Sequence, residues 1–133
     1  MVDWMGLTGN KPELAGKIGI TEGSSAVSCV INWFGPTDLI TMGEDKRALG
    51  NAWGDSDLAD SPESMLLGGA PPLNKEMAKA ASPITYVHKN ARPLLLQYGD
   101  ADRLVPLVHG EVLFNALKEV GVECRLYTIN GGA

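Results

Sequence analysis

Three apolar stretches, separated by long polar segments, dominate the pattern of the chain. Residues 26–34 (AVSCVINWF) are β-branched and almost continuously apolar, residues 94–98 (LLLQY) form a second run, and residues 122–129 (VECRLYTI) form a third. Unbroken apolar runs of this length are typical of strands that are buried on both faces of a parallel sheet. The pattern therefore predicts three strands.

Helical spacing appears between the second and third runs. Gly121 is placed to end a helix over residues 107–120. The apolar positions of this segment fall on one helical face: Val108, Val112, Leu113, Ala116, Leu117 and Val120. Residues 1–9 have the pattern of a helix end, with Gly6 or Gly9 as terminator. The polar, glycine-rich residues 11–26 are predicted to form a surface loop.

Residues 38–90, which we call the lid segment, contain charged residues, glycines and a weak helical pattern. They show no alternation of apolar and polar residues of the kind found in strands. Thr37 or Asp38, in the Gly-Pro turn GPTDL, is placed to cap a helix. Ser61-Pro62-Glu63 has the pattern of a helix start, and a further short helix is expected from about Asn74 to just before Ser82. The order strand, lid segment, strand, helix, strand predicts an α/β fold with a mostly parallel sheet.

Composition limits the function classes. The length of 133 residues suits one small domain over 1–133, and the 44% of hydrophobic residues is ordinary for a globular chain. A net charge of −5 with scattered basic residues argues against nucleic acid as a partner. No stretch approaches the roughly 18 apolar residues of a membrane span, and the N-terminus lacks the pattern of a signal peptide. Cys29 and Cys124 lie in predicted strands, where we expect core positions and not a disulfide framework.

Two carboxylates give the strongest chemical signal. Asp100 and Asp102 follow the second predicted strand, at the end of a strand where open α/β sheets place their active sites. Asp102 could orient a catalytic histidine, as the acid of a Ser-His-Asp triad does. Asp after a strand also readily forms an Asx-turn, and these two residues alone favour that simpler interpretation.

Other catalytic and binding groups are not evident. No serine lies in G-x-S-x-G, and no G-x-G-x-x-G follows a strand, so neither a nucleophile elbow nor a dinucleotide site is predicted. His88 is expected at the surface and His109 at an ordinary helical position. The aspartates of GDSDLAD, residues 54–60, lack the glycine and glutamate of a calcium loop and are expected to be solvated. We predict no metal site and no cofactor.

Several stretches follow one another as in a known family. VINWFGPTDL, SPESMLLGG, AASPITYV, RPLLLQYGDADRLVP and LFNALKEVGVECRLYTINGGA resemble, in this order, the C-terminal half of α/β-hydrolase esterases. The group is the bacterial esterases and lipases labelled feruloyl- or acetyl-esterase-like, and the resemblance runs from about Leu7 to Ala133. It implies a partial α/β-hydrolase fold, with Asp102 in G-D-x-D-x-x-V-P as the triad acid and Asp100 as a turn-stabilising neighbour. It also implies that Phe34 and Pro36 line the substrate pocket.

The resemblance places the other catalytic groups outside residues 1–133. The nucleophilic serine and the oxyanion-hole glycines would lie upstream of Met1, and the histidine just after Ala133. We therefore expect residues 1–133 to be a fragment of a serine esterase that acts on small-molecule esters. The fragment alone should be inactive, because an aspartate by itself cannot catalyse acyl transfer. Residues 26–34 would form an exposed apolar edge able to pair two copies. Two alternatives stay open: a non-catalytic interaction or dimerising module, and part of a prolyl-oligopeptidase-type peptidase.

Overall fold

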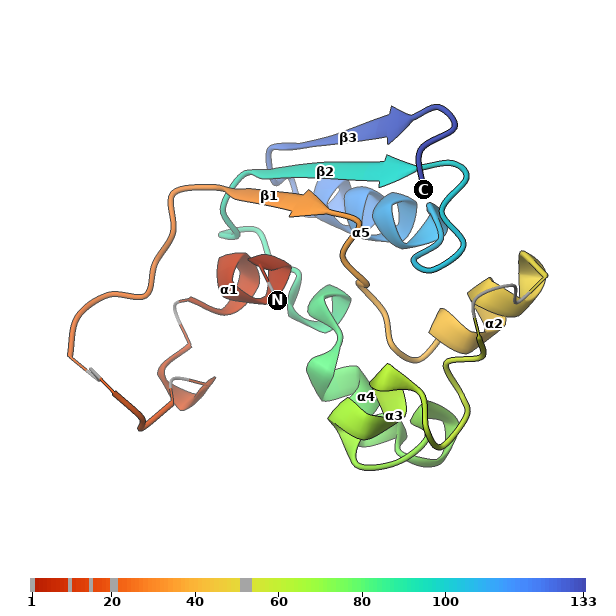
Figure 1. The fold of residues 1–133 in the computed structure, drawn as a ribbon. Coiled ribbons are helices and arrows are strands. Elements are labelled where there is room, and N and C mark those ends of the chain that lie inside the picture. The colour runs from red at the N-terminus through yellow and green to blue at the C-terminus, as the bar shows by residue number, and fades with distance from the viewer. Residues whose placement is uncertain (1, 10, 15, 20–21, 51–53) are drawn as a thin grey trace.

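The computed structural model describes residues 2–9, 11–14, 16–19, 22–50 and 54–133. Figure 1 shows the helices and strands, with three successive α-helices between the first and second strands. In chain order they are α1 (Val2–Thr8), β1 (Val30–Trp33), α2 (Met42–Ala48), α3 (Pro62–Leu67), α4 (Lys75–Ala81), β2 (Leu94–Gly99), α5 (Val108–Glu119) and β3 (Cys124–Ile129). Three 3-10 turns, η1 (Pro12–Leu14), η2 (Pro71–Leu73) and η3 (Pro83–Tyr86), join them.

The three strands form one parallel sheet in the order β1-β2-β3. In the register of the strands, Asn32 lies beside Leu96 and Leu96 beside Leu126, while Trp33 lies beside Gln97 and Gln97 beside Tyr127. Helix α5 connects β2 to the parallel β3, which is the crossover that a parallel pair requires. The predicted α/β class and its parallel sheet are confirmed, although β1 is shorter than the predicted residues 26–34.

One face of the sheet carries the core. The inward-facing side chains of β1 and β2 pack against Leu113 and Leu117 of α5: Val30, Leu94, Leu96 and Tyr98. Helices α1 and α5 lie on this same face (Figure 1). Gly110 allows the close approach of α5, because a Cβ there would come within 2.5 Å of the Tyr98 ring. Burial of these side chains is the main stabilising contribution of the fold.

The opposite face of the sheet is open among the described residues, which corrects the prediction of strands buried on both faces. Ile31 and Trp33 of β1 are 53% and 71% exposed, and Tyr127 of β3, on the same face, is 64% exposed. No described helix covers these side chains, because α1 and α5 both pack on the other face. Cys29 is exposed and Cys124 half-buried, so the expected core position is wrong for Cys29, and both thiols are free.

The buried face of α5 is rotated from the predicted one. Leu113 and Leu117 are buried as expected, but Val112 and Val120 are 42% and 37% exposed. The helix turns His109 and Gly110 inward instead. Glycine carries no apolar signal and histidine carries a polar one, so the periodicity of apolar residues could not include them. Gly121, at φ 78°, ends the helix as predicted.

The lid segment contains α2, α3 and α4 and, within its described residues, no strand. Ser61 caps α3 by accepting a hydrogen bond from Ser64 N at 3.0 Å, with Pro62 in the first turn, as predicted. The cap expected at Thr37 or Asp38 is wrong, because α2 begins only at Met42. A small second core, separate from that of the sheet, joins α3 and α4 to Leu39, which precedes α2: Leu39, Leu67, Ala78 and the half-buried Ala81.

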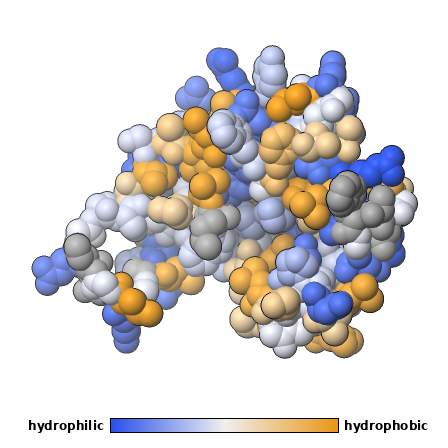
Figure 2. All heavy atoms as spheres, viewed as in Figure 1, coloured by the Kyte–Doolittle hydropathy of each residue, from blue (hydrophilic) through white to orange (hydrophobic). Residues whose placement is uncertain are grey.

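The predicted surface loop leaves the end of α1 and returns to β1. Its described residues, among them those of η1, are exposed or half-buried. Figure 2 shows this loop standing away from the body of the molecule. Within the described residues, no helix is both long and apolar enough to cross a membrane.

Candidate functional site

The segments that carry the predicted site residues meet at one edge of the sheet. Because the three strands are parallel, their carboxyl ends lie together, at the arrowheads in Figure 1. Residues 34–38 leave β1 at this edge, residues 100–102 leave β2, and residues 130–132 leave β3. This is the edge at which open α/β sheets bind their ligands.

Asp102 is a buried carboxylate at this edge, 7% exposed. Its Oδ1 accepts hydrogen bonds from the backbone nitrogens of Leu104 at 2.7 Å and Val105 at 3.0 Å. Both bonds use the same oxygen, so Oδ2 is left to accept from another donor. The side chain therefore forms the Asx-type turn of the simpler interpretation and is also held in one orientation, as the acid of a triad must be.

Asp100 has a different surrounding. It is exposed, and its Oδ1 accepts a hydrogen bond from Gly131 N at 2.6 Å. The backbone adds two bonds, from Asp100 N to Ile129 O at 3.2 Å and from Ala101 N to Gly132 O at 3.0 Å. These contacts hold the segment after β3 against the loop that contains Asp102.

The turn after β1 carries Phe34 and Pro36. Phe34 has φ 55°, in the left-handed region that non-glycine residues rarely adopt. Its half-buried ring lies 6.4 Å from the Tyr98 ring, while Pro36 is exposed. The two residues predicted to line a substrate pocket thus lie at the same edge as Asp102, on the neighbouring strand. Strained backbone held by its surroundings is a feature of ligand-binding edges.

Two buried side chains hold this turn at Gly35. Asn32 Oδ1 accepts from Gly35 N at 2.7 Å, and the Tyr98 hydroxyl donates to Gly35 O. Asn32 also donates through Nδ2 to the Tyr98 hydroxyl at 2.9 Å. Both the N–H and the C=O of Gly35 are therefore bound by core side chains from two strands, which explains how the strained Phe34 conformation is maintained.

The network extends to a carboxyl in α1 that the sequence analysis did not consider. Asp3 is 1% exposed, and its Oδ2 accepts from Asn32 Nδ2. Its Oδ1 is buried and has no partner among the described residues. Burial raises the pKa of Asp3 to about 6. Burial, and then the charge of Asp3, raise the pKa of Tyr98 above its ordinary value, so the hydroxyl stays protonated. The sequence feature that could have indicated this buried network is Asn32, a polar residue inside an apolar run.

We expected His109 at an ordinary helical position. It lies in α5, but its side chain is buried and only 2% exposed. Its Nδ1 accepts from the backbone nitrogens of Thr37 at 3.2 Å and Asp38 at 3.4 Å. Its Nε2 faces Asp45 Oδ2 at 3.5 Å. Burial lowers the pKa of His109, and the nearby carboxylates Asp45 and Asp38 oppose this effect.

We expected His88 at the surface, and the structure shows it half-buried. Its Nε2 lies 3.0 Å from Leu7 O, and its Nδ1 accepts from Asn90 N at 3.1 Å. Leu7 lies in the last turn of α1, where carbonyl groups lack helical partners. His88 thus satisfies a helix end, at the opposite end of the sheet from Asp102.

Two of the three aspartates in residues 54–60 pair with Arg47, so they are not all solvated as expected. Arg47 lies 2.9 Å from Asp55 and 2.7 Å from Asp57, both half-buried, whereas Asp60 is exposed. Hydrogen bonds with Asp57 and then Asp55 raise the pKa of Arg47. No cluster of three or more metal-ligating side chains occurs within the described residues. The arrangement is an ion-pair cluster that braces the lid segment.

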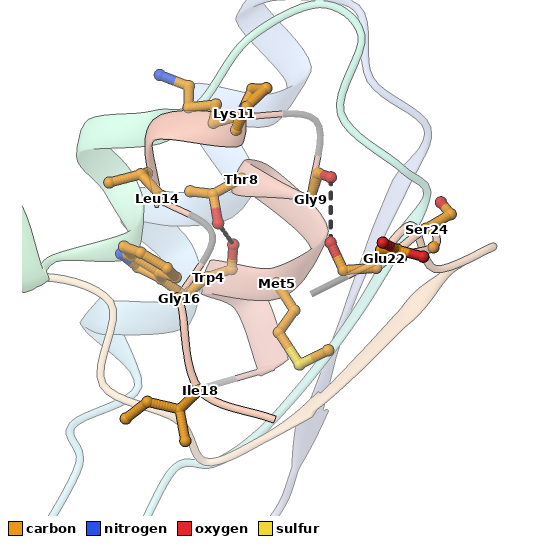
Figure 3. A pocket seen from close by; sticks show the side chains of 13 residues that line it. Trp4, Met5, Thr8, Gly9, Lys11, Leu14, Gly16, Ile18, Glu22 and Ser24 are labelled. Atoms are coloured by element: carbon orange, nitrogen blue, oxygen red, sulfur yellow. Dashed lines mark hydrogen bonds between the residues drawn. The ribbon is translucent and has the colours of Figure 1, made fainter. Parts of the chain in front are cut away.

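A cavity of about 810 Å³ lies between α1 and the loop that follows it. Figure 3 shows Trp4, Met5 and Ile18 among its lining residues, with the Thr8 hydroxyl donating to Trp4 O. Its lining residues lie in α1 and in the loop that leads to the amino end of β1, whereas Asp102 follows the carboxyl end of β2. The cavity therefore contributes no group to the carboxyl edge.

A parallel sheet with helices packed on it, and a buried aspartate at its carboxyl edge, are features that α/β-hydrolases share. The model of the BD-FAE family matches residues 1–117. The chain therefore belongs to the BD-FAE family, an esterase-related α/β-hydrolase family, and the resemblance seen in the sequence is confirmed.

Known proteins that are similar to the chain include esterases. Over 54 residues it is 37% identical to Esterase LipQ of Mycobacterium tuberculosis (strain ATCC 25618 / H37Rv), which covers 41% of this chain and 13% of LipQ. The truncated form of a carbohydrate esterase from gut microbiota matches with a TM-score of 0.81 at 27% identity, over 98% of this chain and 47% of that one. A bifunctional GH43-CE protein of Bacteroides eggerthii matches with a TM-score of 0.80 at 29% identity, over 97% of this chain and 17% of that one. The chain thus spans about half the length of the first of these structures.

Proposed function

We propose that residues 1–133 form the acid-bearing part of a serine carboxylic-ester hydrolase. Asp102 is the acid, and its role is to accept a hydrogen bond from the Nδ1–H of a catalytic histidine and to stabilise the imidazolium that forms during acyl transfer. The observation that carries this proposal is the orientation of Asp102. Two backbone N–H groups hold Oδ1, so Oδ2 is free to meet the histidine.

The contacts of the segment after β3 support the same assignment. Asp100 and Ala101 bind residues 129–132, so the chain that continues beyond Gly132 starts beside the Asp102 loop. A Cβ on Gly99 would fall 2.0 Å from Gly132 O, so glycine at this position allows the two segments to touch. In our proposal the histidine follows this segment and the nucleophilic serine precedes α1, both in a longer reading frame. Residues 1–133 alone are then inactive.

The substrates in this proposal are small-molecule carboxylic esters. Phe34 and Pro36 form part of the wall that faces the substrate, since the turn between them lies at the carboxyl edge beside β2. The lid segment, residues 38–90, leaves this turn, and Asp45 of its first helix faces His109. The esterase-related family supports esters over the peptide substrates of the prolyl-oligopeptidase-type alternative. No cofactor takes part in the proposed reaction.

Self-association is the second proposal and rests on β1. This strand is at the edge of the sheet, and its outward side chains Ile31 and Trp33 are exposed. An unpaired edge with exposed apolar side chains can add a strand from another molecule. We propose that residues 26–34 pair two copies of the chain when nothing else covers the edge.

The catalytic proposal is tested in the reading frame that contains this chain. We expect a G-x-S-x-G motif upstream in that frame and a histidine soon after Ala133, and turnover of a short-chain aryl ester by the protein it encodes. Asp102→Asn keeps an oxygen for Leu104 and Val105 but presents an amide to the histidine, so we expect kcat to fall by on the order of 10³–10⁴. Asp100→Asn is the matched control and should retain most of the activity. Unchanged kcat in Asp102→Asn would contradict the assignment.

A further inference from the structure

One buried histidine joins the two loops of the carboxyl edge. His109 belongs to the first turn of α5, which the loop containing Asp102 enters through Pro106, and His109 N donates to Pro106 O at 3.0 Å. Its side chain, however, binds the turn that follows β1. The Nδ1 atom accepts from Thr37 N and Asp38 N, and the Thr37 hydroxyl donates to His109 O at 2.7 Å.

The ring form follows from these contacts. Thr37 N and Asp38 N are both donors, so Nδ1 must carry a lone pair and the ring proton must be on Nε2. The Nε2–H group then faces the carboxylate of Asp45, 3.5 Å away at the start of α2. A neutral imidazole in this tautomer satisfies the turn on one side and faces an acceptor on the other. An imidazolium would place a third donor against the two backbone N–H groups.

We propose that His109 is a positioning residue that fixes residues 36–38 of the turn, and with them Pro36, relative to Asp102. This inference rests on the proposed esterase function of the carboxyl edge. His109 is 2% exposed and its two ring nitrogens face Thr37, Asp38 and Asp45, so it does not contact a substrate. It acts through the backbone that it holds.

Different side chains hold the two ends of the turn, which makes the role of His109 separable. Asn32 and Tyr98 hold Gly35 at the β1 end of the turn. His109 holds Thr37 and Asp38 at the other end, where the chain departs into the lid segment. Ile84 N also donates to Thr37 O at 3.1 Å, so loss of the His109 ring leaves Gly35 and Thr37 O bound but removes the acceptor of the Thr37 and Asp38 amides. Displacement of a substrate-facing segment by about 1 Å can cost on the order of 10²-fold in rate.

The test compares two variants in the protein encoded by the whole reading frame. In His109→Gln the amide oxygen can accept from Thr37 N and the amide nitrogen can donate toward Asp45, whereas His109→Leu fills space without either bond. With a short-chain aryl ester we expect His109→Leu to lower kcat/KM by on the order of ten- to a hundredfold, mainly through KM. His109→Gln should restore kcat/KM to within a few-fold of the wild type. The control is His88→Leu, which removes the bond to Leu7 O at the other end of the sheet and should leave KM unchanged.

Hydrogen exchange of peptides covering residues 35–40 provides a readout that does not depend on activity. We expect protection of the Thr37 and Asp38 amides in the wild type and in His109→Gln, and faster exchange in His109→Leu. An unchanged KM and unchanged exchange in His109→Leu would overturn the inference, as would His109→Gln failing as severely as His109→Leu at equal Tm. If the wild type does not hydrolyse esters, the proposed function fails while hydrogen exchange still decides whether His109 holds the turn.

Discussion

Asn32 of β1 and Tyr98 of β2 share a hydrogen bond of 2.9 Å inside the core, and each also binds the backbone of Gly35. The two strands are therefore joined by side chains as well as by the sheet. The same pair holds the turn that begins at the strained Phe34. A structural network of the core thus reaches the carboxyl edge where the candidate site lies.

Tyr98→Phe tests this relationship. The variant keeps the ring against Gly110 but removes the hydroxyl, leaving Gly35 O without its donor and Asn32 Nδ2 without one acceptor. We expect a loss of about 1–3 kcal/mol in the free energy of unfolding, measured by urea titration. Tyr127→Phe, at a position 64% exposed, is the control and should change stability little. Equal stability of the two variants would show that the buried hydroxyl contributes nothing.

The Asp3 carboxyl predicts a pH dependence of stability. Its pKa is about 6 in the folded chain against an ordinary value of 3.8, so between these values the folded state binds more protons than the unfolded state. The contribution of Asp3 to stability is therefore fully present below about pH 3.8 and is lost as the pH rises through 6. Above pH 6 the buried group must carry a charge with Oδ1 unpaired.

Asp3→Asn imitates the neutral form of this group. We expect the variant to exceed the wild type in unfolding free energy at about pH 8 by on the order of 2 kcal/mol, with the difference shrinking as the pH falls toward 4. Urea unfolding across this range measures it. Asp60→Asn, at an exposed position, should show no such trend. A constant difference between Asp3→Asn and the wild type at all pH values would rule out the titration of Asp3.

Gly110 is a point of close approach between α5 and the sheet. Gly110→Ala places a Cβ within 2.5 Å of the Tyr98 ring, so either the helix or the ring must move. Overpacking of this kind costs about 1–3 kcal/mol, which we expect as a lower Tm in thermal unfolding. Gly16→Ala is the matched control, because a Cβ at Gly16 meets nothing within 4 Å. A variant as stable as the wild type would mean that the helix can shift without loss.

Strand β1 is an unpaired edge strand, which predicts that residues 1–133 associate with one another. Sedimentation velocity should show few monomers, and Ile31→Lys should shift the population toward the monomer because charge on an edge strand opposes pairing. Ile18→Lys, at a loop position 97% exposed, should have no effect. A clean monomer with a sharp cooperative melt would contradict both the pairing and the view that the chain is part of a larger fold.

Much of the architecture could be predicted because local signals and burial agree there. The strand of Leu94–Gly99, the helix before Gly121 and the cap at Ser61 are each marked by residue types whose conformational preferences match the fold. One kind of failure occurs at Ile31, Trp33 and Cys29, where an apolar residue predicts burial but the described part of the chain provides no cover. Apolar character indicates which face can be buried, but not whether another element lies against it.

The sequence by itself determined the α/β order of elements, the parallel sheet and the place of Asp102 after the second strand. These follow from the periods of apolar residues and from short-range turn chemistry, which act over a few residues. Only the tertiary structure decided the roles of Asp3, Asn32, Tyr98 and His109. Their partners lie 29 to 72 residues away, and a polar side chain is worth burying only where such a partner meets it. The contacts that shape the candidate site therefore arise from the meeting of distant segments, and no local pattern records them.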